Sequence, residues 1–168
     1  MEEATVAIVI SAIAFLLSLF GFYQVQEVKK AKPAPATPFS TLPLQLQAYE
    51  RLVVLCERIA LPNLISRVSQ PDLSAREMQV FLLENIKQEF EYNASQQVYV
   101  TLLAWDAVRN LKDQNMLIIN QIANVMPAEA KARELNRKLL EVVMEDQEKP
   151  LHSAVLETLN FEARKLLK

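Results

Sequence analysis

The sequence predicts an all-α protein with one N-terminal transmembrane helix, a Pro/Ala-rich linker and an antiparallel bundle of about five or six helices. An apolar run without a charged residue extends from Ala4 to Gln26. The single glycine of the 168 residues, Gly21, lies in that run. The remainder therefore lacks the residue that most easily adopts the positive φ of hairpin turns and phosphate-binding loops. Beyond the linker, apolar residues recur every three to four positions, which is typical of helices.

These patterns divide the chain into a transmembrane anchor (1–28), a juxtamembrane linker (29–43) and a cytoplasmic helical bundle (44–168). The stretch from Ala4 to Tyr23 would span about 30 Å as a helix, which matches a bilayer core. The alternative is a cleaved signal peptide, which needs a positive start, whereas Glu2 and Glu3 open this chain.

Basic residues that orient the anchor follow it directly: Lys29, Lys30 and Lys32. Because cytoplasmic flanks of membrane helices are rich in lysine and arginine, the N-terminus is expected outside and the C-terminal domain in the cytoplasm. The expected location is the bacterial inner (cytoplasmic) membrane, crossed once.

Small residues of the anchor alternate at spacings of three and four and form what we call the small-residue seam: Ala4, Ala7, Ser11, Ala14, Ser18 and Gly21. Small side chains on one side of a membrane helix let another helix approach closely. The expected partners are therefore the lipid bilayer and another transmembrane helix, from a second copy or from a subunit of a membrane complex. Chance alignment in a helix rich in alanine and serine is the alternative.

Prolines at 33, 35, 38 and 43 predict an extended linker. After it, apolar spacing and the remaining prolines predict helices over 44–60, 62–69, 74–98, 101–125, 127–147 and 151–167. Ser74 with Glu77 fits a capping box, and Thr101 is placed to cap the helix that follows it. Residues 98–101 resemble a strand but have no partner strand.

The composition gives little indication of a catalytic or ligand-binding site. The net charge of −2 provides no basic surface for nucleic acid. His152 is the single histidine, so we expect no metal, no cofactor and no enzyme activity, and a solvated or capping role for this residue. Cys56 falls on the apolar stripe of its helix and is expected to be a buried, inert thiol.

A candidate binding face comes from two places in the chain. Glu89, Asn93 and Gln96 share one side of a helix, where they would bind a cation or form an ordinary solvated face. Arg58 and Arg67 flank the break near Pro62 and would bind an acidic partner or serve as plain surface arginines.

Asn115 interrupts an apolar seam of its helix, at a position where every neighbour along the seam is apolar. Such a residue usually makes a polar contact in the core that specifies register. A ligand site is the alternative.

Three stretches together resemble a known family: residues 56–64, residues 89–100 and Ala104-Trp105. The family is an uncharacterised one of small single-pass, all-helical inner-membrane proteins of Bacteroidota. Leu102 stands where that family has a proline. The resemblance implies a bacterial inner-membrane setting, and it implies no functional residue because the family has no assigned activity.

The sequence as a whole predicts a membrane-tethered scaffold or accessory subunit of a membrane protein assembly, which packs through the small-residue seam. The alternative is a ligand- or ion-sensing helical module that faces the cytoplasm.

Overall fold

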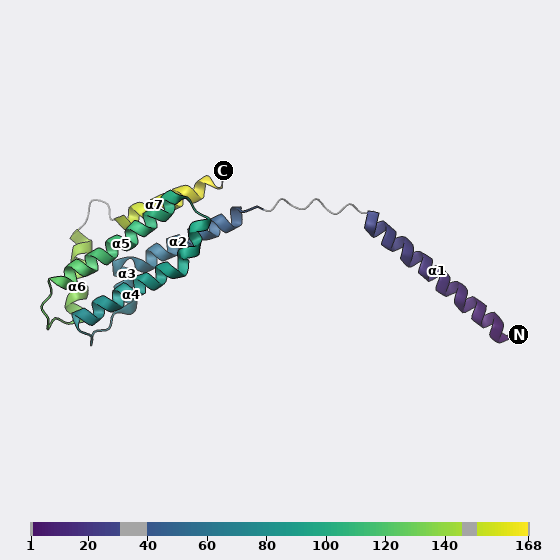
Figure 1. The fold of residues 1–168 in the computed structure, drawn as a ribbon, viewed down its shortest axis with the longest axis horizontal. Coiled ribbons are helices and arrows are strands. Elements are labelled where there is room, and N and C mark those ends of the chain that lie inside the picture. Colours follow the sequence, from purple (N-terminus) through teal and green to yellow (C-terminus); the bar gives the residue numbers. More distant parts are fainter. Residues whose placement is uncertain (1, 31–39, 146–150, 168) are drawn as a thin grey trace. The chain divides into compact units, whose positions relative to one another are not determined.

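The computed structural model describes the backbone of residues 2–30, 40–145 and 151–167, and the side chains of residues 11, 13–26, 40–145 and 151–167. The chain divides into two compact units, Met1–Ser40 and Thr41–Lys168. The described helices are α1 (Glu2–Lys30), α2 (Leu42–Ile59), α3 (Leu61–Val68), α4 (Ala75–Asn93), the 3-10 helix η1 (Ala94–Val98), α5 (Leu102–Asn124), α6 (Ala132–Glu145) and α7 (Leu151–Lys165). Figure 1 labels the α-helices.

The first unit contains α1, a helix of 29 residues. Its large apolar side chains between Ile13 and Val25 are all exposed, each by half or more of its surface. A helix that is apolar on all sides normally has its surface covered. Within this unit, the described part of α1 has no such cover.

The structure does not support the predicted transmembrane anchor. Among the residues whose side chains the structure describes, no helix has the length and apolarity needed to cross a membrane. The predicted single-pass inner-membrane location, with the N-terminus outside and the bundle in the cytoplasm, is contradicted by the same finding.

The structure describes no side chain of the residues proposed to orient the anchor. The side chains of Lys29 and Lys30 and the whole of Lys32 lie outside the described residues, as do the side chains of Ala4 and Ala7 at the start of the small-residue seam.

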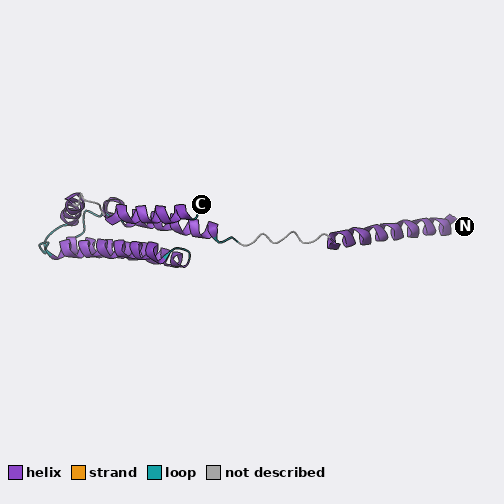
Figure 2. Ribbon diagram, turned by 90° about the horizontal axis from the view of Figure 1, so that it is seen from above, coloured by secondary structure: helices purple, strands orange, loops and turns teal. Residues whose placement is uncertain are grey.

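The second unit is a helical bundle, which confirms the all-α prediction. Its described residues form six α-helices, α2–α7, and η1, and the described part of the chain includes no strand. α2 contacts α4 and α7, and α5 contacts the same two helices, so these four form a closed ring. Figure 1 shows the chain reversing direction between α4 and α5, and Figure 2 shows the long helices of this unit in two layers. α6 packs against α3, α4 and α5.

One hydrophobic core joins the helices of the bundle. Its largest fully buried side chains come from six of them: Leu52, Leu55, Ile59, Leu64, Met78, Leu82, Ile86, Leu111, Ile119, Leu135, Leu139 and Leu159. Met78, Leu82 and Ile86 form the buried stripe of α4. At the far end of α4, Phe90 packs against Trp105 of α5 with ring centroids 5.0 Å apart.

Two helix starts were predicted correctly from local sequence. The Ser74 hydroxyl accepts a hydrogen bond from the main-chain N–H of Glu77 (3.2 Å), and the Glu77 carboxylate accepts one from the N–H of Ser74 (2.9 Å), which forms the capping box of α4. The Thr101 hydroxyl accepts from the N–H of Ala104 (3.2 Å) at the start of α5.

Two predicted boundaries were wrong. The α-helix expected over 74–98 ends at Asn93 and continues as η1 to Val98. The strand-like residues 98–101 contain the end of η1 and the turn that follows it. The helix expected from Pro127 begins at Ala132. The reason is a main-chain pairing: the N–H of Ala75 donates to the carbonyl of Ala130 (2.8 Å), and the N–H of Ala132 donates to the carbonyl of Leu73 (2.9 Å). This pairing forms an isolated β-bridge between Ser74 and Lys131.

Candidate functional site

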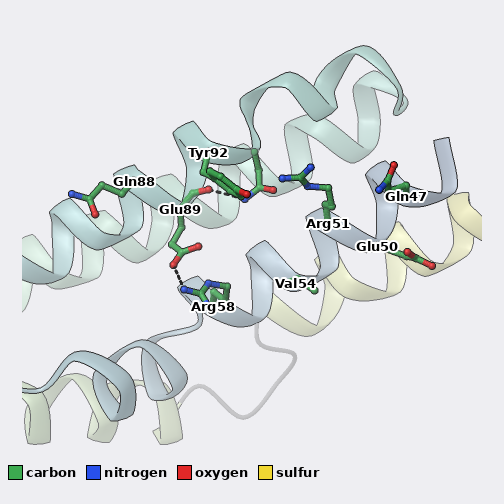
Figure 3. Close-up of a pocket in the computed structure, with 9 residues that line it drawn as sticks. Gln47, Glu50, Arg51, Val54, Arg58, Gln88, Glu89 and Tyr92 are labelled. Carbon is green, nitrogen blue, oxygen red and sulfur yellow. Dashed lines mark hydrogen bonds and ion pairs between the residues drawn. The ribbon is translucent and has the colours of Figure 1, made fainter. Parts of the chain in front are cut away.

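A groove of about 710 Å³ lies between α2 and α4 and is the candidate site. We call it the α2–α4 groove, and Figure 3 shows its side chains. It is lined by Gln47, Glu50, Arg51, Val54, Arg58, Gln88, Glu89, Tyr92 and Asn93. Along each helix these residues, singly or as adjacent pairs, recur every three to four positions, so each helix presents one stripe to the groove.

Three charged side chains form a cluster at one end of the groove. Glu89 on α4 accepts hydrogen bonds on one carboxylate oxygen, Oε1, from Arg58 on α2 (2.5 Å) and from Arg67 on α3 (3.0 Å). Arg67 also donates to the main-chain carbonyl of Arg58 (3.0 Å), which fixes the two arginines relative to each other. The cluster therefore joins three helices.

The electrostatics of the cluster follow from this geometry. The hydrogen bond from Arg58 lowers the pKa of Glu89, and Arg67 lowers it further, while partial burial acts in the opposite direction. The hydrogen bond to Glu89 raises the pKa of Arg58. Two positive charges on one negative charge leave the cluster with an excess of one positive charge. The Arg58 side chain remains 45% exposed, so its remaining donors can reach a further anionic group.

An aromatic and aliphatic surface adjoins the cluster. The guanidinium carbon of Arg51 lies 5.3 Å from the ring centroid of Tyr92, a cation–π contact between α2 and α4. Tyr92 is 74% exposed and Val54 is 56% exposed. Tyrosine and arginine are the residue types enriched at the centres of protein–protein interfaces.

The structure brings most of the predicted binding face together. Arg58, Glu89 and Asn93 line the groove, and Arg67 contacts Glu89 from α3. The Asn93 amide donates to the main-chain carbonyl of Glu89 (2.9 Å). Gln96 is buried in η1, where its amide donates to the Ser95 hydroxyl (3.1 Å), and it does not line the groove.

Sequence reasoning found Arg58 but missed the rest of the α2 side of the groove. Gln47, Arg51, Val54 and Arg58 follow one another at spacings of four, three and four, which marks one stripe of a helix. This spacing is visible in the sequence, but it indicates one wall of a groove only when α4 lies beside α2.

Other residues singled out from the sequence occupy structural positions. Asn115 is buried, and its amide donates to the main-chain carbonyl of Ile59 (2.8 Å), as expected of a polar contact in the core. Cys56 is buried, as predicted, and burial raises its pKa to about 12. His152 is half-buried, with Nε2 3.6 Å from Oε1 of Glu57. Among the described residues, no three His, Cys, Asp or Glu side chains form a group suited to a metal ion.

The described part of the small-residue seam consists of Ser11, Ala14, Ser18 and Gly21, which are exposed on α1. A Cβ atom added at Gly21 would meet nothing within 4 Å. The seam is thus open to close approach at this position.

The comparisons with known proteins identify a family and no activity. A family model described as a family of unknown function, DUF7935, matches residues 2–166, which confirms the prediction of an uncharacterised family. No curated protein and no solved structure matches the chain.

Proposed function

We propose that this chain, which belongs to the DUF7935 family of unknown function, is a scaffold without a catalytic role. Its bundle binds a segment of a partner protein in the α2–α4 groove, and α1 packs against a further helix. One observation carries the proposal: the Arg51–Tyr92 contact lies in the same groove as the Arg58–Glu89–Arg67 cluster, so an exposed aromatic surface adjoins an excess of positive charge.

The chemistry of the groove indicates what the partner segment carries. An acidic side chain would pair with the exposed guanidinium of Arg58, where Glu89 and Arg67 already hold it in place. An apolar side chain would cover Val54 and the ring of Tyr92, which are both largely exposed. We infer that the segment combines an Asp or Glu with an apolar residue.

The exposed surface of α1 supports the second half of the proposal. Its apolar side chains from Ile13 to Val25 are half exposed or more, and leaving them in water is unfavourable. A helix that meets α1 along the small-residue seam would approach closely, because Ala14, Ser18 and Gly21 project little. Such a contact would bring two or more bundles into one assembly.

The ion-sensing alternative has less support. The Glu89 oxygen that would bind a cation is occupied by Arg58 and Arg67, whose positive charges repel cations. The Asn93 amide is engaged with the main chain of its own helix. Both observations favour an anionic segment over a metal ion in the groove.

The groove is tested by site-specific crosslinking of the full chain in its native cells. A photo-reactive amino acid at Val54 is expected to crosslink one partner protein, and Arg51→Glu or Tyr92→Ala is expected to abolish that product. Arg133→Glu and Phe161→Ala are the controls, because they reverse an arginine charge and remove an aromatic ring at exposed positions on α6 and α7. If no protein is crosslinked at Val54, or if Arg51→Glu leaves the product unchanged, the groove is not the binding site.

The α1 contact is tested separately by chemical crosslinking of the purified full chain. Ala14→Leu and Gly21→Leu are expected to reduce the crosslinked oligomer or hetero-complex, because larger side chains separate the two helices. Leu16→Ala, on the opposite side of α1, is the control. Equal crosslinking in the seam variants and in the wild type would exclude the α1 contact. It would not affect the proposal that the α2–α4 groove binds a partner segment.

A further inference from the structure

Two contacts across the α2–α4 groove show how its walls run. Arg51 on α2 contacts Tyr92 on α4, whereas Arg58, later on α2, contacts Glu89, earlier on α4. The two walls are therefore antiparallel along the groove. Figure 3 shows these contacts one after the other, with Val54 on the α2 wall. In one direction along the groove, both walls thus pass from the aromatic and aliphatic surface to the charged cluster.

The apolar part and the charged part of the groove lie one helical turn apart on each wall. Val54 precedes Arg58 by four residues on α2, and Glu89 precedes Tyr92 by three residues on α4. At 1.5 Å per residue, these spacings are about 6 Å and about 4.5 Å along the helix axes. A helix that runs along the groove presents residues three or four positions apart with the same separation and on the same side.

The main chain of the bound segment distinguishes a helix from an extended conformation. Residues two positions apart in an extended segment also span about 6.6 Å, but extended main chain needs hydrogen bonds from its surroundings, such as a sheet edge provides. The walls of this groove are α-helices, whose interior main-chain groups are bonded within each helix. The Asn93 amide is engaged with the carbonyl of Glu89. Gln47 and Gln88 would serve only part of an extended segment, whereas a helix satisfies its own main chain.

We propose that the segment bound in the α2–α4 groove is an α-helix of a partner protein, which carries an Asp or Glu three or four residues from a large apolar residue. The acidic side chain pairs with Arg58, and the apolar side chain covers Val54 and the ring of Tyr92. The helix runs along the stripe of α2 from Gln47 to Arg58, a length of about 16 Å. This inference rests on the proposed function, because it describes the segment that the groove is proposed to bind.

The first test places a photo-reactive amino acid at Gln47, Val54 or Gln88 of the full chain in its native cells. Mass spectrometry then maps each crosslinked residue of the partner. Gln47 and Val54 are seven residues apart on α2, which is about 10.5 Å. Their crosslinks are expected about seven residues apart in a helical partner segment, whereas an extended segment would place them about three residues apart. Position 88 is expected to crosslink the same segment from the α4 wall, and Leu117, exposed on α5, is the control position that does not.

The second test measures binding of a synthetic peptide of the mapped segment to the purified full chain by fluorescence anisotropy. A peptide with proline at a solvent-facing position in its middle is expected to bind about 100-fold more weakly than one with alanine there, because proline breaks a helix. Arg58→Gln is expected to weaken binding of the unmodified peptide and to have no effect on a peptide whose acidic residue is replaced by its amide. Arg133→Gln, at an exposed position on α6, is the control.

The outcomes separate this inference from the proposed function. Crosslinks from Gln47 and Val54 that lie about three residues apart, or equal binding of the proline and alanine peptides, would overturn the helix and leave the groove as a binding site. Equal binding by Arg58→Gln and the wild type would overturn the acidic contact. If no protein is crosslinked at Val54, the proposed function fails and the inference fails with it. A product made of two copies of this chain would assign the groove to self-association and would overturn both.

Discussion

The side-chain amide of Asn115 donates a 2.8 Å hydrogen bond to the main-chain carbonyl of Ile59, 56 residues earlier in the chain. Ile59 is the last residue of α2, and the final carbonyls of a helix have no partner within it. Asn115 therefore satisfies a buried main-chain group from the middle of α5. The contact sets the position of α5 against the joint where α2 gives way to α3.

This contact predicts the effect of replacing Asn115. Asn115→Leu is expected to lower the free energy of unfolding by about 1–3 kcal/mol, because it leaves the buried carbonyl of Ile59 without a partner. Urea unfolding followed by circular dichroism measures the change. Asn110→Leu, at an exposed position of the same helix, is the control and is expected to have little effect. Equal stability of Asn115→Leu and the wild type would show that the hydrogen bond contributes nothing.

The capping box predicts a second stability change. Ser74→Ala removes the acceptor for the N–H of Glu77 and is expected to cost about 1 kcal/mol. Thermal and urea unfolding both report it. Ser66→Ala, at an exposed position of α3, is expected to have no measurable effect. If both variants unfold at the same urea concentration, the box does not stabilise α4.

The Arg58–Glu89–Arg67 cluster predicts a pH dependence of stability. The pKa of Glu89 lies below its usual value of 4.5 in the folded protein, so the unfolded chain takes up this proton first as the pH falls. The contribution of the cluster is complete above about pH 5 and is lost as the pH falls through the lowered pKa. For partly exposed pairs it is worth about 0.2–1 kcal/mol.

The measurement compares the wild type with Glu89→Gln between pH 7 and pH 3 by urea unfolding. The variant is expected to be less stable at pH 7, and the difference is expected to shrink toward pH 3. Glu91→Gln, at an exposed position on the same helix, is the control. A difference that stays constant with pH would exclude ionised Glu89 as its source.

Burial of Cys56 predicts slow reaction with thiol reagents. With a pKa of about 12, only about one thiol in ten thousand is ionised at pH 8, and the thiolate is the reactive form. Iodoacetamide is therefore expected to leave the native chain unmodified over hours and to modify it readily in urea. Mass spectrometry distinguishes the two. Native and unfolded chains that react at similar rates would show that Cys56 is accessible.

Local sequence predicted the features that depend on neighbouring residues. The capping box needs only residues 74–77, the cap at Thr101 needs only residues 101–104, and both are as predicted. Helical spacing alone also places Met78, Leu82 and Ile86 on one side of α4, and all three are buried.

Features that depend on distant residues were missed or misjudged. The late start of α6 results from a pairing with Leu73 and Ala75, more than 50 residues away. Arg58, Arg67 and Glu89 were proposed as members of one candidate face, but their shared carboxylate oxygen needs three helices in place. The membrane anchor was inferred from the apolarity of residues 4–23, and the described part of α1 does not reach the length and apolarity of a span.

The β-bridge between Ser74 and Lys131 gives α4 and α6 a common origin. Both helices begin immediately after the bridge, so their rotation about their own axes is set from one point. Residues inserted in the turn before Ala130 would lengthen only that turn and would leave the rotation of both helices unchanged. One residue inserted directly after Lys131 would instead turn the rest of α6 by about 100° and carry Leu135 and Leu139 out of the core. The bridge therefore fixes the rotation of both helices. A change in chain length is tolerated before the bridge but not between the bridge and α6.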